Sequence, residues 1–464
     1  MNDKMVLHEA QDTVFGPGEQ LVEKWGKYMD VIQEVAKDEG RHVDDITLMT
    51  TAICLENLEQ HLGRLDEATL STAVGSFIHH GFDLIAAVMP SLIANQIVSI
   101  QPQTRKIGEI FYMEFLYGKA KGNINKGDTM FGYQTAGNSE IWYTSDNVPD
   151  EIVGTGTGSE DGFSGNLGSF PMVGGSLSVT DGVEVFADNG KGVLTGDKGG
   201  TGIINYTNGA YDVTFKTAPL VDVNVLATYR IDFEANPDLI PEVNLSIQSM
   251  PTIARPRKLR ARYTLDASFD VSSAFGRSVG TELDVALASE IRQEIDGELM
   301  QAMMAQYGSG LTEWSRKPGD GISYAEHKWT FIDSIIAASN AIFTATRRAV
   351  ANFIVAGIGV CNVIESLAPR FKPAGKVQPG PHFIGTLDNL KVYKNPYYST
   401  YDAIAGYKGD LFMEAGLVYA PYMPLFTTQP IMLDDFITRK GLATSYSKKM
   451  VQPKFYQKLT VTNT

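Results

Sequence analysis

One long amphipathic helix is the feature that most limits how this chain can fold. Between Thr281 and Tyr307, apolar side chains recur every fourth residue, with Met300 and Met304 beside them. The recurring positions are Leu283, Leu287, Ile291, Ile295, Leu299 and Met303. At a rise of about 1.5 Å per residue the helix would be roughly 40 Å long, well beyond the ~11 residues of an average helix. Its polar face is acidic and holds Glu282, Asp284, Glu290, Glu294, Asp296 and Glu298 against Arg292 alone.

The segments that follow this helix predict an α/β arrangement. A helix is expected over 330–348, a buried strand over 352–360 and a second helix over 361–368. The end of the chain, 448–463, is predicted to form a strand. Together with the strands expected before the long helix, this predicts a protein of the α+β class.

Glycine is concentrated before the long helix, where 154–209 holds 16 of the chain's 45 glycines. Such density argues against helix and favours loops and short strands. Within this segment, 203–215 predicts a hairpin, because Asn208-Gly209 supplies the positive φ angles of a tight turn. Further strands are predicted around it, over 107–117, 221–233 and 243–253.

The negative charge of the chain is uneven. The net charge is −15, and the first 70 residues hold 15 of the acidic side chains and only 6 of the basic ones. This segment is predicted to be helical, because its apolar residues follow one helix face. They are Leu21, Val22, Trp25, Met29, Ile32 and Val35. An acidic surface repels polyanions, so wrapping duplex DNA in a basic groove is not expected.

Cysteine usage and the chain start favour a soluble protein made in a reducing cytosol. Cys54 and Cys361 stand about 300 positions apart, which gives neither a disulfide framework nor a zinc cluster. Residues 1–5 lack the profile of a signal peptide. The longest apolar run, 84–100, is interrupted by polar residues and is too short to span a bilayer.

Five basic side chains lie within eight positions just before the long helix: Arg255, Arg257, Lys258, Arg260 and Arg262. One hypothesis is that they bind nucleic-acid phosphates, although the acidic helix begins only 19 residues beyond Arg262. The other hypothesis, which we favour, is ion pairing with carboxylates of the same or a neighbouring subunit.

No motif in the chain predicts an enzyme. Residues 276–280 match the G-x-S-x-G elbow of hydrolases, but that elbow needs a buried strand directly before the serine. The preceding residues are small and polar, so we interpret them as a lead-in to the long helix, capped by Ser278 or Thr281. The glycine-rich segment lacks a phosphate loop, and the seven histidines form no metal-binding motif. We therefore expect no catalytic, cofactor or metal site.

Four stretches occur in a recognisable order along the chain. They are 87–118, a helix with Pro90 leading to an aromatic strand; 257–300, the basic strand running into the long helix; 406–425, with Ala420-Pro421-Tyr422; and 436–463, where FITRKGL precedes PKFYQKLTV. In this order they resemble the major capsid protein of tailed bacteriophages, in the T-even myovirus type of the HK97-like fold. The glycine-rich middle, especially 202–219, is similar to a small β-domain of phage virion proteins.

The resemblance implies an HK97-like capsid fold and a part for each segment. The implied parts are an acidic helical N-terminal segment over 1–67, an N-arm over 68–100, an extended β-loop over 101–255 with an insertion at about 154–232, a peripheral domain over 256–329 with its spine helix at 281–307, an axial domain over 330–430 and a peripheral return strand over 431–464.

The resemblance also implies a function. The chain would assemble with itself into hexamers and pentamers of an icosahedral head, which encloses double-stranded DNA without sequence-specific contact. Expected assembly partners are a scaffolding protein, a portal, and a maturation protease or decoration protein. Synthesis would occur in the bacterial cytoplasm and the final location would be the virion, with no cofactor and no membrane. The alternative is another virion protein, such as a vertex, decoration, tail or baseplate component.

Two sets of residues gain a role from the resemblance. The spine helix would face the lumen, where Glu290, Glu294 and Glu298 would repel packaged DNA and keep it mobile. Relatives are cut after a short Leu/Ile-x-Glu sequence, and Leu65-Asp66-Glu67, followed by Ala68, matches that pattern. The same tripeptide also arises by chance in acidic helices, so cleavage after Glu67 and an intact chain are both open alternatives.

Overall fold

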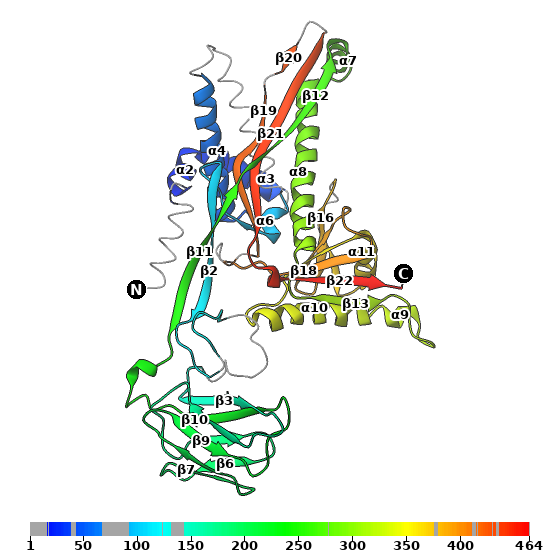
Figure 1. Ribbon diagram of the computed structural model, residues 1–464. Coiled ribbons are helices and arrows are strands. Elements are labelled where there is room, and N and C mark those ends of the chain that lie inside the picture. The colour runs from blue at the N-terminus through cyan, green and yellow to red at the C-terminus, as the bar shows by residue number, and fades with distance from the viewer. Residues whose placement is uncertain are drawn as a thin grey trace. The chain divides into compact units, whose positions relative to one another are not determined.

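The computed structural model describes residues 16, 18–38, 43–66, 92–122, 124–130, 143–276, 278–374, 379–410, 414, 416–428, 430–432 and 436–463. These residues belong to two compact units. The first unit combines Met1–Tyr112 with Gln248–Thr464, and the second is Met113–Ile247. Helices and strands both occur in quantity, which confirms the predicted α+β class (Figure 1).

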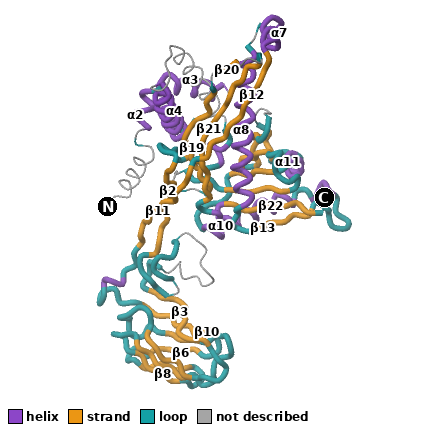
Figure 2. The backbone as a smooth tube through the Cα atoms, turned by 45° about the horizontal axis from the view of Figure 1, so that its top comes forward, coloured by secondary structure: helices purple, strands orange, loops and turns teal. Residues whose placement is uncertain are grey.

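A five-stranded sheet of mostly long strands runs through the first unit. In order, its strands are β1 (Ser99–Ile100), β19 (Leu417–Thr427), β21 (Ile437–Met450) and β12 (Arg255–Thr264), with β20 (Ile431–Met432) paired to β21. β12 and β21 are antiparallel without a break, from Arg255 opposite Tyr446 to Thr264 opposite Ile437. The helix α8 (Val279–Ala305) lies along this sheet (Figure 2), which confirms the long helix predicted over 281–307.

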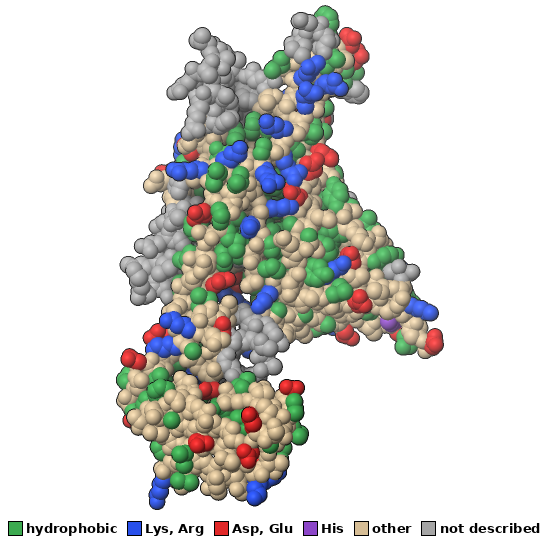
Figure 3. Space-filling view, in the orientation of Figure 1, with side chains coloured by type: hydrophobic (Ala, Val, Ile, Leu, Met, Phe, Trp, Pro, Cys, Tyr) green, Lys and Arg blue, Asp and Glu red, His purple; other side chains and the backbone are tan. Residues whose placement is uncertain are grey.

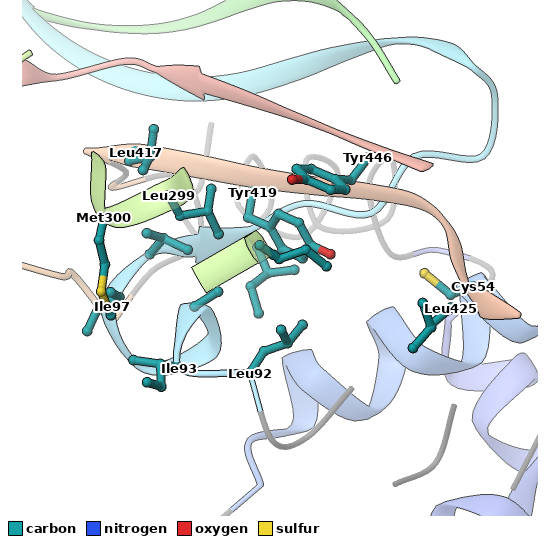
Figure 4. Packing of buried hydrophobic residues seen from close by; sticks show 14 of the residues in the cluster. Cys54, Leu92, Ile93, Ile97, Leu299, Met300, Leu417, Tyr419, Leu425 and Tyr446 are labelled. Carbon is teal, nitrogen blue, oxygen red and sulfur yellow. The ribbon is translucent and has the colours of Figure 1, made fainter. Parts of the chain in front are cut away.

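The largest core of the first unit lies between α8, β19 and the N-terminal segments. Figure 4 shows Leu299 and Met300 of α8 close to Tyr419 of β19 and to Ile97 of the short helix α6 (Ala94–Ile97). Each of these four side chains is at most 2% exposed. α8 therefore joins segments that are hundreds of residues apart in the sequence.

Among its described residues, the first unit begins with three helices, as predicted for the acidic segment. They are α2 (Gly18–Lys24), α3 (Gly26–Asp38) and α4 (Asp45–Asp66). Trp25, Met29 and Ile32 of the predicted apolar face are buried. The Lys24 ammonium connects α2 to α4, with its Nζ 2.6 Å from Glu56 Oε2.

The polar face predicted for α8 is wrong at two positions. Asp284 and Asp296 are each only 2% exposed. Asp284 pairs with Lys440 of β21, and the carboxylate of Asp296 accepts the backbone N–H of Ile93 at 3.3 Å and that of Ala94 at 3.1 Å. Helical spacing alone does not distinguish a solvated carboxylate from a buried one whose partners come from distant segments.

A second sheet of the first unit is mixed and has seven strands. In order, these are β13 (Leu311–Ser315), β22 (Tyr456–Thr462), β18 (Asp402–Gly406), β14 (Phe353–Ala356), β17 (Leu390–Lys394), β16 (His382–Leu387) and β15 (Phe371–Pro373). The order α10 (Thr330–Thr346), β14, α11 (Ile358–Glu365) confirms the predicted helix–strand–helix pattern, and α9 (Tyr324–His327) precedes it. Phe353 packs into the core of α8 and Ile354 into the core of α10 and α11, so β14 is buried on both faces.

The C-terminal strand predicted over 448–463 is divided between the two sheets. β21 ends at Met450, the 3-10 turn η4 (Pro453–Phe455) follows, and β22 runs between β13 and β18. Pro453 has no N–H to donate to a ladder, which favours the break at this point. The prediction of one continuous strand was therefore wrong, because the chain changes sheets at the turn.

The second unit contains a sheet of eight antiparallel strands in the order β3-β10-β5-β6-β7-β8-β9-β4. Their bounds are β3 (Asn147–Thr155), β4 (Gly162–Asn166), β5 (Ser178–Thr180), β6 (Val185–Asp188), β7 (Val193–Gly196), β8 (Thr201–Ile204), β9 (Ala210–Thr214) and β10 (Asn224–Arg230). β8 and β9 form the predicted hairpin, with Gly209 at φ +70° in its turn. Phe186, Phe215 and Tyr229 fill the core of this sheet.

Two long strands cross the boundary between the units. β2 (Ile107–Tyr117) and β11 (Val243–Ile253) pair with each other as a two-stranded sheet, and both have the bounds predicted for them. The short turn η3 (Pro237–Leu239) precedes β11.

Candidate assembly surface

β12 directs its basic side chains to two opposite faces. Successive side chains of a strand point in opposite directions, and exposure along β12 alternates accordingly. Arg257 is partly buried on the face toward α8, whereas Lys258, Arg260 and Arg262 are exposed on the other face. The group of five that is continuous in the sequence is therefore divided by the pleat of the strand.

Arg257 is the centre of an ion-pair cluster that joins β12, β21 and α8. Its guanidinium lies 3.2 Å from Glu294 Oε2 and also contacts Glu298. The Nζ of Lys448 lies 2.9 Å from Glu298 Oε1, and the Tyr446 hydroxyl donates a hydrogen bond to the same carboxylate. Arg257 thus pairs with carboxylates of its own chain.

The cluster shifts the acid–base equilibria of its members. Burial by itself would raise the pKa of Glu298, but the hydrogen bond from Tyr446 and the charges of Lys448 and Arg257 hold that pKa below its usual value. Burial would lower the pKa of Arg257, yet Tyr446, Glu298 and Glu294 raise it. Both groups are therefore held in their charged forms.

The other face of β12 concentrates positive charge. Arg439 of β21 lies directly opposite Arg262, and opposed residues of antiparallel strands share a face. We define Lys258, Arg260, Arg262 and Arg439 as the basic face. Figure 3 shows basic side chains gathered over β12 and β21. Arg255, Lys258, Arg260 and Arg262 make no ion pair with any residue that the structure describes.

The three glutamates expected to face a lumen differ in their surroundings. Glu294 and Glu298 both contact Arg257. Glu290 is exposed and forms no ion pair within the described part of the chain. Of these three glutamates, Glu290 is therefore the one without an ion-pair partner among the described residues.

The helix α4 is anchored in the body of the first unit. Cys54, Leu55 and Leu58 are at most 1% exposed, and Figure 4 shows Cys54 beside Leu425 of β19. The side-chain amide of Asn57 donates to the carbonyl oxygens of Gln103 at 2.9 Å and Tyr422 at 2.8 Å. These two hydrogen bonds were not predicted from the sequence, although an amide within an apolar run of a helix indicates a buried polar contact.

The residues of the suspected cleavage site fall at the limit of what the structure describes. Leu65 lies in the last turn of α4, which ends at Asp66. Glu67 and Ala68 lie outside the described residues. The described part of the segment before this site is nevertheless packed into the core through α4.

The serine of the G-x-S-x-G match lies between two helices. α7 (Leu265–Phe275) begins where Thr264 accepts a hydrogen bond from Ala267 N–H and ends at Gly276, with φ +64°. The interpretation of the residues before the long helix as a lead-in was wrong for α7, because these caps favour a helix. The element directly before Ser278 is therefore α7 and not a buried strand. Ser278 is the N-cap residue of α8, as predicted for one of the two candidates, but its side chain makes no capping hydrogen bond.

The described residues contain neither a metal-binding cluster nor a membrane-spanning helix. There, no group of three His, Cys, Asp or Glu side chains is arranged to hold a metal ion. Over the same stretches, no helix combines the length and apolarity needed to cross a membrane. Cys54 and Cys361 are both buried and not in a disulfide.

A comparison with known protein families shows which family the chain belongs to. Residues 74–464, more than four fifths of its length, match the family described as Major capsid protein Gp23. The chain belongs to this family of major capsid proteins. It is therefore a structural subunit of a phage head shell, and it assembles with copies of itself.

Several curated relatives of this capsid protein carry the same description. The major capsid protein of Vibrio phage KVP40 is 24% identical over 387 residues, which cover 74% of this chain and 70% of the relative. Those of Enterobacteria phages T6 and T4 are each 25% identical over 410 residues, or 77% of this chain and 76% and 73% of the relatives. These matches support the head-shell role and give no support to the alternative of a vertex, decoration, tail or baseplate protein.

Solved structures give more distant likenesses to this capsid protein. The capsid of Myoviridae phage XM1 has a TM-score of 0.34 and 10% identity, covering 48% of this chain and 78% of the other. A structure from Mycobacterium phage Che8 has a TM-score of 0.31 and 13% identity, covering 49% and 79%. The family assignment rests on the sequence match.

Proposed function

We propose that this capsid protein forms hexamers and pentamers that join into an icosahedral head enclosing double-stranded DNA. A heterologous contact repeated around a ring closes it, and many weak contacts per subunit add up to a stable shell. The basic face supports this proposal, because it gathers like charges of which Lys258, Arg260 and Arg262 have no ion-pair partner in the described chain.

The basic face and Arg255 pair with carboxylates of a neighbouring subunit. The chain has a net charge of −15, so each copy offers acidic surface to the next. Opposite charges at a rim steer association and fix its register.

Reversing charge on the basic face tests this assignment. We expect Arg260→Glu with Arg262→Glu to leave a folded subunit and to reduce shell yield strongly in electron micrographs. Lys317→Glu with Lys372→Glu is the matched control, because both lysines are exposed in the first unit and lie outside the basic face. Normal shells from the Arg260/Arg262 variant, with only weaker DNA retention, would support the nucleic-acid hypothesis instead.

The acidic side of α8 faces the lumen and keeps packaged DNA mobile. Glu290 carries this role with the least ambiguity, because Glu294 and Glu298 contact Arg257. A surface carboxylate repels phosphate over about a Debye length, which shortens with salt. Glu290→Lys shells should retain DNA more strongly at low ionic strength than wild-type shells, and equal retention at all salt concentrations would contradict the lumen assignment.

The eight-stranded sheet of the second unit acts as an interface module inserted into the extended loop. A deletion tests this role, and it has to remove the whole sheet, which extends from Asn147 to Arg230. Removing 154–210 alone would separate β3 and β10 from their neighbouring strands. Asn147 and Arg230 are opposite each other in register, so an Asn-Gly turn joining them removes the module cleanly. We expect a folded subunit that forms altered shells, whereas wild-type shells at normal yield would exclude an interface role.

Assembly partners and maturation complete the proposal. A scaffolding protein, a portal, a maturation protease and a decoration protein would act on the shell, without sequence-specific DNA contact and without catalysis by Ser278. Cleavage after Glu67 would detach α4, whose Cys54, Leu55 and Leu58 belong to the core. N-terminal mass spectrometry of virion protein tests this step: a chain beginning at Ala68 is expected, and an intact Met1 excludes it.

A further inference from the structure

The helix α10 has an apolar outer face in addition to its buried one. Its inner side, including Phe331, Ile335 and Ile342, packs into the core of the seven-stranded sheet. On the outer side, Ile336 is 48% exposed and Phe343 is 49% exposed. Residues seven apart lie almost directly above one another on a helix. Trp329 and Val350, just beyond the two ends, continue the same spacing and are 39% and 51% exposed.

This outer stripe, defined as Trp329, Ile336, Phe343 and Val350, is unusual for a solvent-facing helix. Exposed helix faces normally carry charged residues, as α8 does with Glu282, Glu290 and Glu294. The 17 residues of α10 contain one charged side chain, Asp333. A continuous exposed apolar stripe marks an interaction site.

A lipid surface does not fit the stripe. Helices that lie on membranes carry Lys and Arg along the polar side to contact lipid headgroups. α10 has neither residue, and its other side is occupied by the protein core. The partner is therefore protein rather than membrane.

A second copy of the chain matches the stripe chemically. Ile336 and Phe343 stand at equal distances from the midpoint of 339 and 340, and so do Trp329 and Val350. Two antiparallel copies of the stripe would thus set apolar residues against apolar residues.

We propose that the outer face of α10 is covered by a second copy of this chain in the assembled shell. The proposal rests on the proposed self-assembly and names one of its surfaces. Burying Ile336 and Phe343 between subunits removes the exposed apolar area that the free subunit presents to water. The contact is an additional one, because α10 and the basic face of β12 lie on different sheets.

A single introduced thiol tests the proposal directly. Both native cysteines are buried, so Asn340→Cys provides the one exposed thiol in the described chain. We expect a maleimide to label this thiol quickly in free subunits and at least tenfold more slowly in shells. Equal labelling in both states would overturn the proposal. If the wild-type chain forms no shells at all, the proposed assembly itself is contradicted. Intact shells that are labelled as fast as free subunits contradict only the contact at α10.

A substitution provides the second measurement. Phe343→Asp should leave the circular dichroism and Tm of the free subunit unchanged, because the side chain is half exposed, while reducing shell yield at least tenfold. Val285→Asp is the matched control, since Val285 is 63% exposed on α8. Normal shell yield from Phe343→Asp would also overturn the proposal. Oxidation of Asn340→Cys shells then reports the geometry, because a disulfide-linked dimer requires two stripes that meet about their midpoints.

Discussion

Asp284 of α8 and Lys440 of β21 form an ion pair in the interior of the first unit, with side chains that are 2% and 8% exposed. The pair connects the long helix to the central strand of its sheet. Removing two charges from water is costly, and the pair compensates this cost only while both partners are present. The ion pair therefore fixes the position of α8 against β21 more than it adds to the free energy of unfolding.

Breaking this pair from one side should be far more damaging than replacing both partners. We expect Asp284→Leu or Lys440→Met alone to lower the free energy of unfolding by about 3–5 kcal/mol, because each leaves a buried charge. The double variant should lie within roughly 1 kcal/mol of wild type. Urea unfolding of the free subunit measures all three. Lys449→Met is the control on the same strand, where the lysine is exposed.

The Glu298 cluster should make stability depend on pH in the acid range. The folded pKa of Glu298 lies below the ordinary value of 4.5, so its contribution is fully present above that value. It is lost as the pH falls through the lower, folded pKa, because the folded state must then take up a proton. Between about pH 5 and pH 3, the Tm of Glu298→Gln should decrease less steeply with falling pH than the Tm of wild type. An identical pH profile in both proteins would contradict this, and Glu290→Gln serves as the exposed control.

The two cysteines should be inert in the folded subunit. Burial raises the pKa of Cys54 to about 12, and burial, opposed by Lys394, also raises that of Cys361 to about 12. The reactive thiolate is therefore scarce at neutral pH, and access is blocked as well. We expect no labelling by a maleimide over an hour in buffer and two labels per chain in urea, counted by mass spectrometry. Rapid native labelling of Cys361 would show that the core of α10 and α11 opens.

Elements with a strong local signal could be predicted from the sequence. The strands over 107–117 and 243–253 have the predicted bounds, and the long helix differs by two residues at each end. α7 was missed even though its signals are local: Thr264 caps its start and Gly276 ends it. Small polar residues inside the helix concealed a pattern that the caps would have revealed.

The candidate surface was less predictable, because its chemistry depends on distant segments. Asp284 meets a lysine 156 positions later, and Asp296 meets a backbone N–H 202 positions earlier. The separation of Arg257 from Arg260 follows from the pleat only once the face toward α8 is known. A single sequence gives residue types and periods, whereas pairing requires the tertiary arrangement.

The anchor of α4 should control access to Cys54, which tests whether the N-terminal helices can detach. Asn57→Asp places a carboxylate where the amide now donates to Gln103 and Tyr422, so two hydrogen bonds are lost and their acceptors face a negative charge. A hydrogen bond contributes about 0.5–1.5 kcal/mol net, so losing two costs about 1–3 kcal/mol, and about 1.4 kcal/mol is tenfold in an opening equilibrium. Maleimide labelling of Cys54 should therefore accelerate roughly 10- to 100-fold, with labelling of Cys361 unchanged because it lies in the other core. Gln60→Glu adds the same charge at an exposed position of α4 and should leave the labelling rate at the wild-type value. Equal acceleration of both thiols would mean that the whole unit unfolds, and no acceleration would mean that packing of Leu55 and Leu58 alone holds α4 in place.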